Sequence, residues 1–250
     1  MASTMKSDKP LHNRRDMLAL MGAAATATLV GCAHGPGGPS GPYTQQTIAG
    51  CLVSPEQTEG PFFVDEKLNR SDLRFDPANG SVSPGVPLRL VLHLSRVTNN
   101  SCTPLPGATV DVWHCDALGT YSDVRDNAGD SGDTRGRKFL RGYQVTDGQG
   151  KVEFQTIYPG WYQGRNVHVH YKIRTNPTSG VGHEFTSQLF FDEAITDQVH
   201  GQAPYAQKGR RDTTNSSDDI YSRGGTDLML ALSKDAEGYT GTYKVAMLMV

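Results

Sequence analysis

A phenol, a guanidinium and two imidazoles fall within nine residues of the chain, from Tyr162 to His170. From Val167 onward apolar and polar residues alternate, which predicts a β-strand because successive side chains of a strand point to opposite faces. His168 and His170 therefore lie on one face, with Cα atoms about 6.5–7 Å apart. Two imidazoles at that spacing can reach one ion, so the segment predicts half of a metal site.

The neighbouring side chains narrow the choice of metal. Imidazole is a ligand of Zn, Cu, Fe and Ni, whereas a phenolate oxygen is a hard ligand that favours a strongly polarising ion such as Fe(III). Tyr162 therefore favours iron. A His-X-His pair can also be no more than the polar face of a strand turned to water. The presence of Tyr162 and Arg165 beside the pair favours the metal interpretation.

A second segment of similar character lies upstream, at residues 108–121. It alternates as a strand does and then runs through a Gly-containing loop that ends on Tyr121. Together with the motif that ends at His170, this segment resembles the intradiol ring-cleaving dioxygenases, the family of protocatechuate and catechol dioxygenases. The resemblance covers most of residues 51–195, because it continues in three shorter motifs at 58–63, 70–74 and 188–191.

The resemblance implies a cofactor and a reaction. In that family two Tyr and two His hold a non-haem Fe(III), and carried over residue by residue the implied ligands are Tyr121, Tyr162, His168 and His170. Arg165 matches an active-site Arg of the family and Gln188 a position beside the iron, so both join Tyr162 as candidates for catalysis. The implied reaction cleaves a catechol-type ring with O₂ and releases a muconate-type diacid. Which Tyr leaves the iron when substrate binds stays open.

The residue types are compatible with that chemistry. Two phenolates and a hydroxide neutralise the three charges of Fe(III), and Arg165 can stabilise negative charge on the ring carbon that O₂ attacks. Two alternatives come from other classes. One is an exported β-sandwich binding module with a metal or sugar site and no catalysis. The other is a hydrolytic zinc enzyme, which two Tyr ligands disfavour.

Three further residues near these motifs have open or structural roles. Trp113 is either a core aromatic or part of the site lining. His114 falls on the opposite face of the same strand and is predicted to be a hydrogen-bonded framework residue. Phe190 stands where protocatechuate-cleaving relatives carry a Tyr, so the identity of the catechol stays open. The nearest subclass is an exported form similar to the protocatechuate dioxygenase β-subunit, since relatives acting on simple catechol carry an N-terminal helical domain for which this chain has no room.

The N-terminus predicts export. Arg14 and Arg15 precede an apolar, Ala-rich run, which is typical of the twin-arginine route. The run from 17 to 31 has 15 residues, short of the ~20 apolar residues that span a bilayer. Residues 29–32 resemble a bacterial lipobox, so we expect a lipid anchor at Cys32, with plain secretion as the alternative. The predicted organisation is a signal at 1–32, a Gly/Pro-rich tether at 33–47 and a folded domain at 48–250.

Strand patterns recur through the predicted domain and no helical pattern of similar length competes with them. They predict an all-β fold, a two-sheet antiparallel β-sandwich with long loops, whose strands are expected at 88–94, 109–115, 152–157, 167–174, 185–191, 227–233 and 243–250. Residues 122–138 are predicted to form a mobile loop near Tyr121.

Composition limits the partners. The net charge is −2 with both signs mixed along the chain, so we expect no nucleic-acid partner and no electrostatic attraction to an anionic membrane surface. Besides Cys32 there are three cysteines, and in an oxidising compartment one pair can form. Cys51 and Cys102 are the favoured pair because both flank the alternating core, whereas Cys115 lies in a strand. The sequence alone does not establish this pairing, and it does not predict the oligomeric state.

Overall fold

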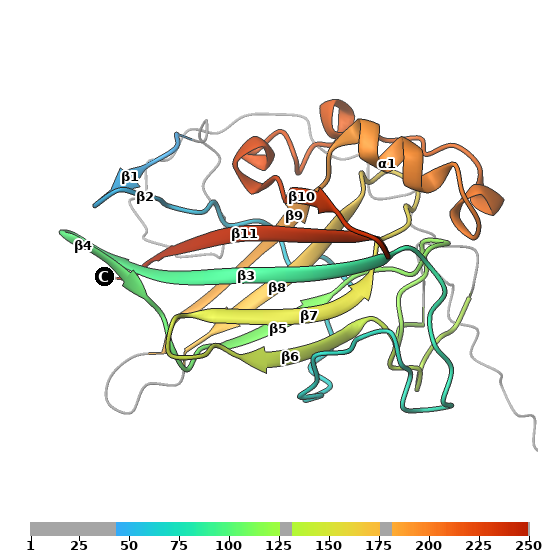
Figure 1. Ribbon diagram of the computed structural model, residues 1–250, viewed down its shortest axis with the longest axis horizontal. Coiled ribbons are helices and arrows are strands. Elements are labelled where there is room, and N and C mark those ends of the chain that lie inside the picture. Colours follow the sequence, from blue (N-terminus) through green and yellow to red (C-terminus); the bar gives the residue numbers. More distant parts are fainter. Residues whose placement is uncertain (1–43, 126–131, 176–181, 250) are drawn as a thin grey trace, which may run out of the picture. The chain divides into compact units, whose positions relative to one another are not determined.

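The computed structural model describes residues 44–125, 132–175 and 182–249 (Figure 1). The predicted export signal, with Arg14, Arg15 and Cys32, lies outside the described residues, and so does most of the predicted tether. The described residues fall within one compact unit, which runs from Gly41 to Val250.

Two main sheets form this unit. The four-stranded sheet is antiparallel throughout and has the strand order β6 (Arg141–Val145), β5 (Thr109–Trp113), β8 (His168–Arg174) and β9 (Glu184–Phe190). The five-stranded sheet has the order β10 (Ala231–Lys234), β11 (Tyr239–Leu248), β3 (Pro87–Thr98) and β4 (Ser101–Pro104), with β7 (Lys151–Ile157) paired to β3. A two-stranded hairpin, β1 (Thr47–Ile48) and β2 (Cys51–Leu52), precedes them.

The core lies between the two main sheets, and β8 and β9 pass behind β3 and β11 in Figure 1. Each sheet contributes the apolar residues that its period-two pattern places on one face. Strand β3 contributes Leu88, Leu90, Leu92 and Leu94, and β8 contributes Val169, Tyr171 and Ile173. These side chains are almost fully buried and form one cluster.

The predicted all-β sandwich is confirmed, and three details were wrong. Strand β11 pairs with β3 in parallel, so the sandwich is not entirely antiparallel. The segment expected as a strand at 227–233 begins as the 3₁₀ helix η4 (Gly225–Leu228), and strand β10 starts only at Ala231. The predicted strand at 109–115 ends at Trp113.

Helices that the sequence analysis did not predict follow β9. Helix α1 (Glu193–His200) is capped by the Asp192 carboxylate, which accepts a hydrogen bond from the backbone N–H of Ile195. Two 3₁₀ helices follow it, η2 (Tyr205–Lys208) and η3 (Asn215–Ser217). None of the helices in the described ranges is long and apolar enough to cross a bilayer.

The favoured disulfide is present. Cys51 and Cys102 are bonded across 51 residues, which ties the hairpin β1–β2 to strand β4. In the chain-entropy model, closing a loop of that length stabilises the fold by about 4 kcal/mol. Cys115 is buried and free.

Candidate metal centre

Strand β8 places the two predicted histidines. Its apolar face packs into the core, so His168 and His170 point to the other face, as the alternation predicted. In the strand register His170 lies opposite Trp113 of β5 and Gln188 of β9, and His168 lies opposite Phe190. The ladder thus brings Gln188 of β9 beside the histidine pair of β8.

The two tyrosines come from loops that pack backbone against backbone. The turn before Tyr121 is held by the Asp116 carboxylate, which accepts backbone hydrogen bonds from Leu118 and Thr120, both at 2.9 Å. At Gly119, φ is +85° and a Cβ would lie 2.1 Å from the Trp161 carbonyl oxygen. Only glycine fits there, and the close approach brings the loop of Tyr121 next to that of Tyr162.

Four donor atoms meet in the space between these elements. The Nε2 atom of His168 lies 3.0 Å from Nε2 of His170, 3.3 Å from Oη of Tyr162 and 3.4 Å from Oη of Tyr121. With metal–ligand bonds of about 2.0–2.2 Å, neighbouring donors around one ion are about 3.0–3.5 Å apart. The spacing of the four donors therefore fits a single ion.

All four side chains are buried, and burial changes their proton affinities. It raises the pKa of Tyr162 to about 12 and that of Tyr121 well above its usual value. It also lowers the pKa values of His168 and His170 well below their usual range. Burial thus favours the neutral imidazoles that bind metals, whereas the phenols need a nearby cation in order to ionise.

Arg165 adjoins the donors and is held from two sides. Its Nη1 is 3.5 Å from Nε2 of His168, its Nη2 donates to Oε1 of Gln188 at 2.6 Å, and its Nε donates to Oδ2 of Asp218 at 2.8 Å. Gln188 in turn donates to the Thr58 carbonyl at 2.9 Å. Both predicted catalytic neighbours of the donors, Arg165 and Gln188, therefore belong to one hydrogen-bonded network.

The sequence analysis missed Asp218 and Asn166. The Asp218 side chain is fully buried and accepts from the Asn166 backbone N–H at 2.9 Å as well as from Arg165. Burial acts to raise the pKa of this carboxyl, but the backbone N–H groups and the guanidinium outweigh it and lower the pKa. Because 52 residues separate Asn166 from Asp218 and no motif marks either one, no local signal in the sequence could have identified them.

A third missed residue, Arg141, supports the loop of Tyr121. Its guanidinium is buried, donates to Oγ of Ser122 at 2.7 Å and to the Phe62 carbonyl at 3.2 Å, and also bonds the Ser122 carbonyl. Burial lowers the pKa of Arg141 to about 10, so it stays charged at neutral pH. In the predicted loop at 122–138, residues 126–131 lie outside the described part, and Thr134 donates to the Tyr121 carbonyl at 2.7 Å.

Of the remaining residues that the sequence singled out, Trp113 borders the donors and His114 does not. Trp113 is buried with its ring stacked on that of His170, so it borders the donors. His114 points away from them and bonds Oγ1 of Thr156 at 2.7 Å, and burial lowers its pKa to about 4, as suits the predicted framework role. Phe190 is fully buried and makes an edge contact with Tyr221.

Tyrosine is essential to this donor set. Within the described ranges, no group of three or more His, Cys, Asp and Glu side chains could hold a metal ion. The four donors qualify as a candidate centre only because two of them are phenol oxygens, which suits a hard, highly charged cation.

Comparison with known proteins agrees with this fold. Residues 58–210 match the family model described as Dioxygenase. The structure of an intradiol ring-cleavage dioxygenase from Tetranychus urticae is 32% identical, with a TM-score of 0.67 over 79% of this chain and 95% of that one. The chain therefore belongs to the intradiol ring-cleavage dioxygenase family.

Curated relatives match over a shorter stretch. A chlorocatechol 1,2-dioxygenase from Pseudomonas putida is 31% identical over 122 residues, which are 40% of this chain and 42% of the relative. A catechol 1,2-dioxygenase from Candida albicans is 30% identical over 105 residues, 41% of this chain and 31% of the relative. The chain thus spans less than half the length of these curated relatives.

Proposed function

We propose that the protein is a non-haem Fe(III) dioxygenase that opens a catechol-type ring with O₂, between the two hydroxylated carbons, to give a muconate-type diacid. The observation that carries the proposal is the meeting of two phenol oxygens and two imidazole nitrogens beside a guanidinium. The residues that would hold the iron are Tyr121, Tyr162, His168 and His170. Bound Fe(III) would supply a Lewis acid, which would activate a catechol that binds it through its oxygens.

The residues around the donors have separate tasks. Arg165, fixed by Asp218 and Gln188, stabilises the negative charge that develops on the ring next to the donors. As a phenolate, Tyr162 accepts on its Oη a proton that the catechol loses on binding, because burial favours the neutral phenol over the phenolate. Tyr162 is better placed to move than Tyr121, because it is 6% exposed and meets Phe62 edge-on at 6.0 Å, whereas Tyr121 is fully buried and stacks on Phe62 at 4.5 Å.

Oxygen uptake by the purified, metal-analysed protein tests the reaction. We expect about one Fe per chain, a red-brown colour from phenolate-to-iron charge transfer, and O₂ consumption that yields ring-opened muconates. A colourless protein with stoichiometric zinc contradicts the metal assignment. Extradiol products contradict the proposed position of cleavage, and coloured protein that consumes no O₂ with any catechol favours the binding module.

The same assay, run as a substrate panel, tests the subclass. The resemblance favours a protocatechuate-type enzyme, whereas the buried Phe190 lacks the hydroxyl that such enzymes carry at this position. Comparing kcat/KM for catechol, protocatechuate and hydroxyquinol decides between these substrates. A preference for protocatechuate supports the subclass, and a preference for an uncharged catechol excludes it.

We also propose that the protein is exported by the twin-arginine route and held by a lipid on Cys32. The proposal rests on the sequence of residues 1–32, and the disulfide between Cys51 and Cys102 supports an oxidising compartment. Replacing Arg14 and Arg15 by Lys should leave active enzyme in the cytoplasm, while Cys32→Ser should block lipid attachment without changing the colour. Cell fractionation with lipid labelling measures both steps. Normal export of the double-Lys variant contradicts the route, and unlabelled wild-type protein contradicts the anchor.

A further inference from the structure

The two histidines of the candidate centre are held in different ways. Nδ1 of His168 donates to the Asn166 carbonyl at 2.7 Å, which fixes the ring and leaves the Nε2 lone pair facing the other donors. Nδ1 of His170 is buried and has no hydrogen-bond partner among the described residues. A metal-binding imidazole is normally oriented by a bond to its second nitrogen, so something else must orient the ring of His170.

Two neighbours enclose the ring of His170. Strand pairing places Trp113 directly opposite it, and the two rings lie 5.0 Å apart between centroids with planes only 8° apart. Gly60 lies against the edge of the same imidazole: a Cβ on Gly60 would be 3.3 Å from Cε1 of His170. The indole therefore defines the plane of the imidazole, and Gly60 closes its Cε1–Nε2 edge.

Trp113 is itself fixed from behind. It is 1% exposed, and the ring of Phe63 packs on it with centroids 4.8 Å apart. Nζ of Lys172 lies 4.4 Å above Phe63, and this ammonium pairs with Glu184 at 2.9 Å and with Glu59. A cation–π contact thus holds Phe63, which in turn packs against the indole.

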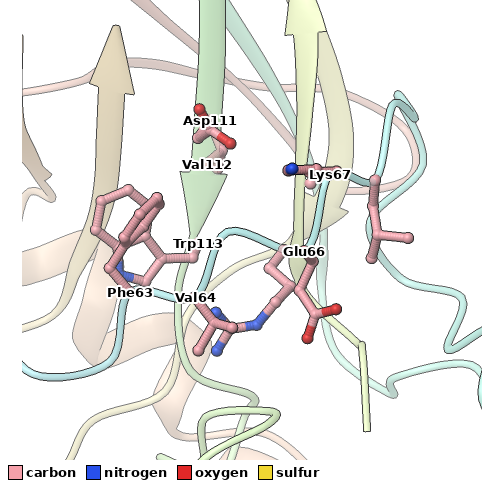
Figure 2. A pocket seen from close by; sticks show the side chains of 10 residues that line it. Phe63, Val64, Glu66, Lys67, Asp111, Val112 and Trp113 are labelled. Carbon is pink, nitrogen blue, oxygen red and sulfur yellow. The ribbon is translucent and has the colours of Figure 1, made fainter. Parts of the chain in front are cut away.

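The space next to Trp113 is too small for the indole to swing away. Figure 2 shows Phe63, Trp113 and Glu66 among the side chains that line a small cavity, which Arg141 also lines. The volume of this cavity is about 10 Å³. A volume of that size holds at most about one water molecule. The indole plane is therefore set before any ligand binds.

We propose that Trp113 is a positioning residue, which sets the ring orientation of His170 by stacking where His168 relies on a hydrogen bond. The inference rests on the proposed function. An imidazole binds a metal along the lone pair of the ligating nitrogen, which is Nε2 in His170, and functional groups of this kind must be held within about 10–20° of the productive geometry. A flat aromatic face can impose that limit, whereas a branched aliphatic side chain of similar position cannot.

The test compares Trp113→Phe and Trp113→Leu in the purified, iron-loaded full chain. Phe keeps a flat face and Leu does not. We expect Trp113→Leu to shift the visible charge-transfer maximum, to change the electron paramagnetic resonance signal of Fe(III), and to release iron to a chelator on the order of tenfold faster or more, the scale of losing an orienting neighbour of a ligand. Trp113→Phe should lie between Leu and wild type.

The matched control is Phe154→Leu, since Phe154 is a fully buried aromatic on β7 in the other sheet. It should lower the melting temperature and leave the iron spectrum and release rate unchanged. A wild-type spectrum and release rate in Trp113→Leu overturns the inference. Equal spectral changes in Phe154→Leu overturn it too, because the effect is then general loosening.

A readout without iron separates this inference from the proposed function. If the wild type binds no iron, the proposed function fails, and the histidine ring signals are compared by nuclear magnetic resonance. Trp113→Leu should then broaden the ring-proton signals of His170, because the imidazole is no longer held in one orientation, and leave the line widths of His114 unchanged. His170 signals as sharp as in the wild type overturn the inference.

Discussion

The two sheets of the sandwich use the same alternating pattern and bury it differently. In β3 the leucines face the core, while Arg89 on the other face is exposed and His93 is only partly covered. In β8 the first six residues are all buried, polar and apolar alike. The loop around residues 54–63 covers part of the polar face of the four-stranded sheet, because Gln188 donates to the Thr58 carbonyl and Gly60 lies against the ring of His170. The four-stranded sheet, whose polar face is buried and carries the two histidines, is called the functional sheet below.

Burying this face has an energetic consequence. A buried polar atom without a partner costs about 1–3 kcal/mol. On this face of the four-stranded sheet, three buried side-chain atoms have no partner within the described part of the chain: Trp113 Nε1, His170 Nδ1 and Arg174 Nε. The described strands of the five-stranded sheet contribute none. We infer that the unpartnered atoms of the functional sheet lower the free energy of unfolding, and that the apolar residues of the five-stranded sheet offset this loss. Four predictions test the inference.

The largest effect should come from removing a donor. Tyr162→Phe or His168→Ala leaves three donors and should abolish the visible band, the bound iron and the turnover. Tyr162→Phe removes a buried hydroxyl and keeps the ring, so its metal-free form should be about as stable as the metal-free wild type, whereas His168→Ala also removes the bond to the Asn166 carbonyl and should be less stable. Iron analysis and urea unfolding after chelation measure the two quantities. A variant that keeps its colour contradicts the donor set.

Arg165→Ala should lower kcat on the order of a hundredfold or more, the scale of losing one group that stabilises developing charge. Iron and colour should persist, since the guanidinium is a neighbour of the donors and not one of them. The control is Arg174→Ala, an arginine at the end of β8 that pairs with Asp111 and Asp65 instead. It should keep its kcat. Loss of iron from Arg165→Ala would make Arg165 structural.

The difference between the two sheets was only partly predictable from the sequence. Alternation predicted the faces of β3 and β8, and the family motifs predicted which Tyr and His residues the fold brings together. The parallel pairing of β11 with β3 was not predictable, because alternation does not encode strand direction. Asp218 and Arg141 were missed because they act through loops, where hydrogen-bond partners distant in sequence leave no periodic signal. Helix α1 has only eight residues, too few for a clear helical period.

The five-stranded sheet should respond to substitution through stability alone. Leu92→Ala removes a fully buried side chain from β3, and changes of this kind cost about 2–5 kcal/mol. We expect a lower midpoint of urea unfolding with unchanged iron content, visible spectrum and kcat in the folded protein at 25 °C. A spectral shift in Leu92→Ala would show that the two sheets are coupled, and would remove the distinction drawn between them.

The smallest effect should come from Asp76, a buried carboxylate outside both main sheets that has its hydrogen-bond donors in place. Asp76 is fully buried and accepts from Nε of Arg137 at 2.6 Å and from the backbone N–H groups of Ala78 and Lys138, both at 3.0 Å. Burial acts to raise the pKa of Asp76, but these donors outweigh it and lower the pKa. A carboxyl with a lowered folded-state pKa stabilises the fold above its unfolded value of about 3.9, and this contribution is lost as the pH falls through the folded value.

Asp76→Asn should therefore cost about 1.5–3 kcal/mol at pH 7, the range for hydrogen bonds to a charged group. The difference from wild type should shrink as the pH falls through the unfolded value of about 3.9 towards the lower folded value, because the wild type then loses the charge as well. Urea unfolding at several pH values measures this. A difference that stays constant with pH would mean that Asp76 acts by shape alone. It would also imply that the well-partnered carboxylate gains nothing from its charge, and that the cost assigned to the functional sheet does not arise from missing partners.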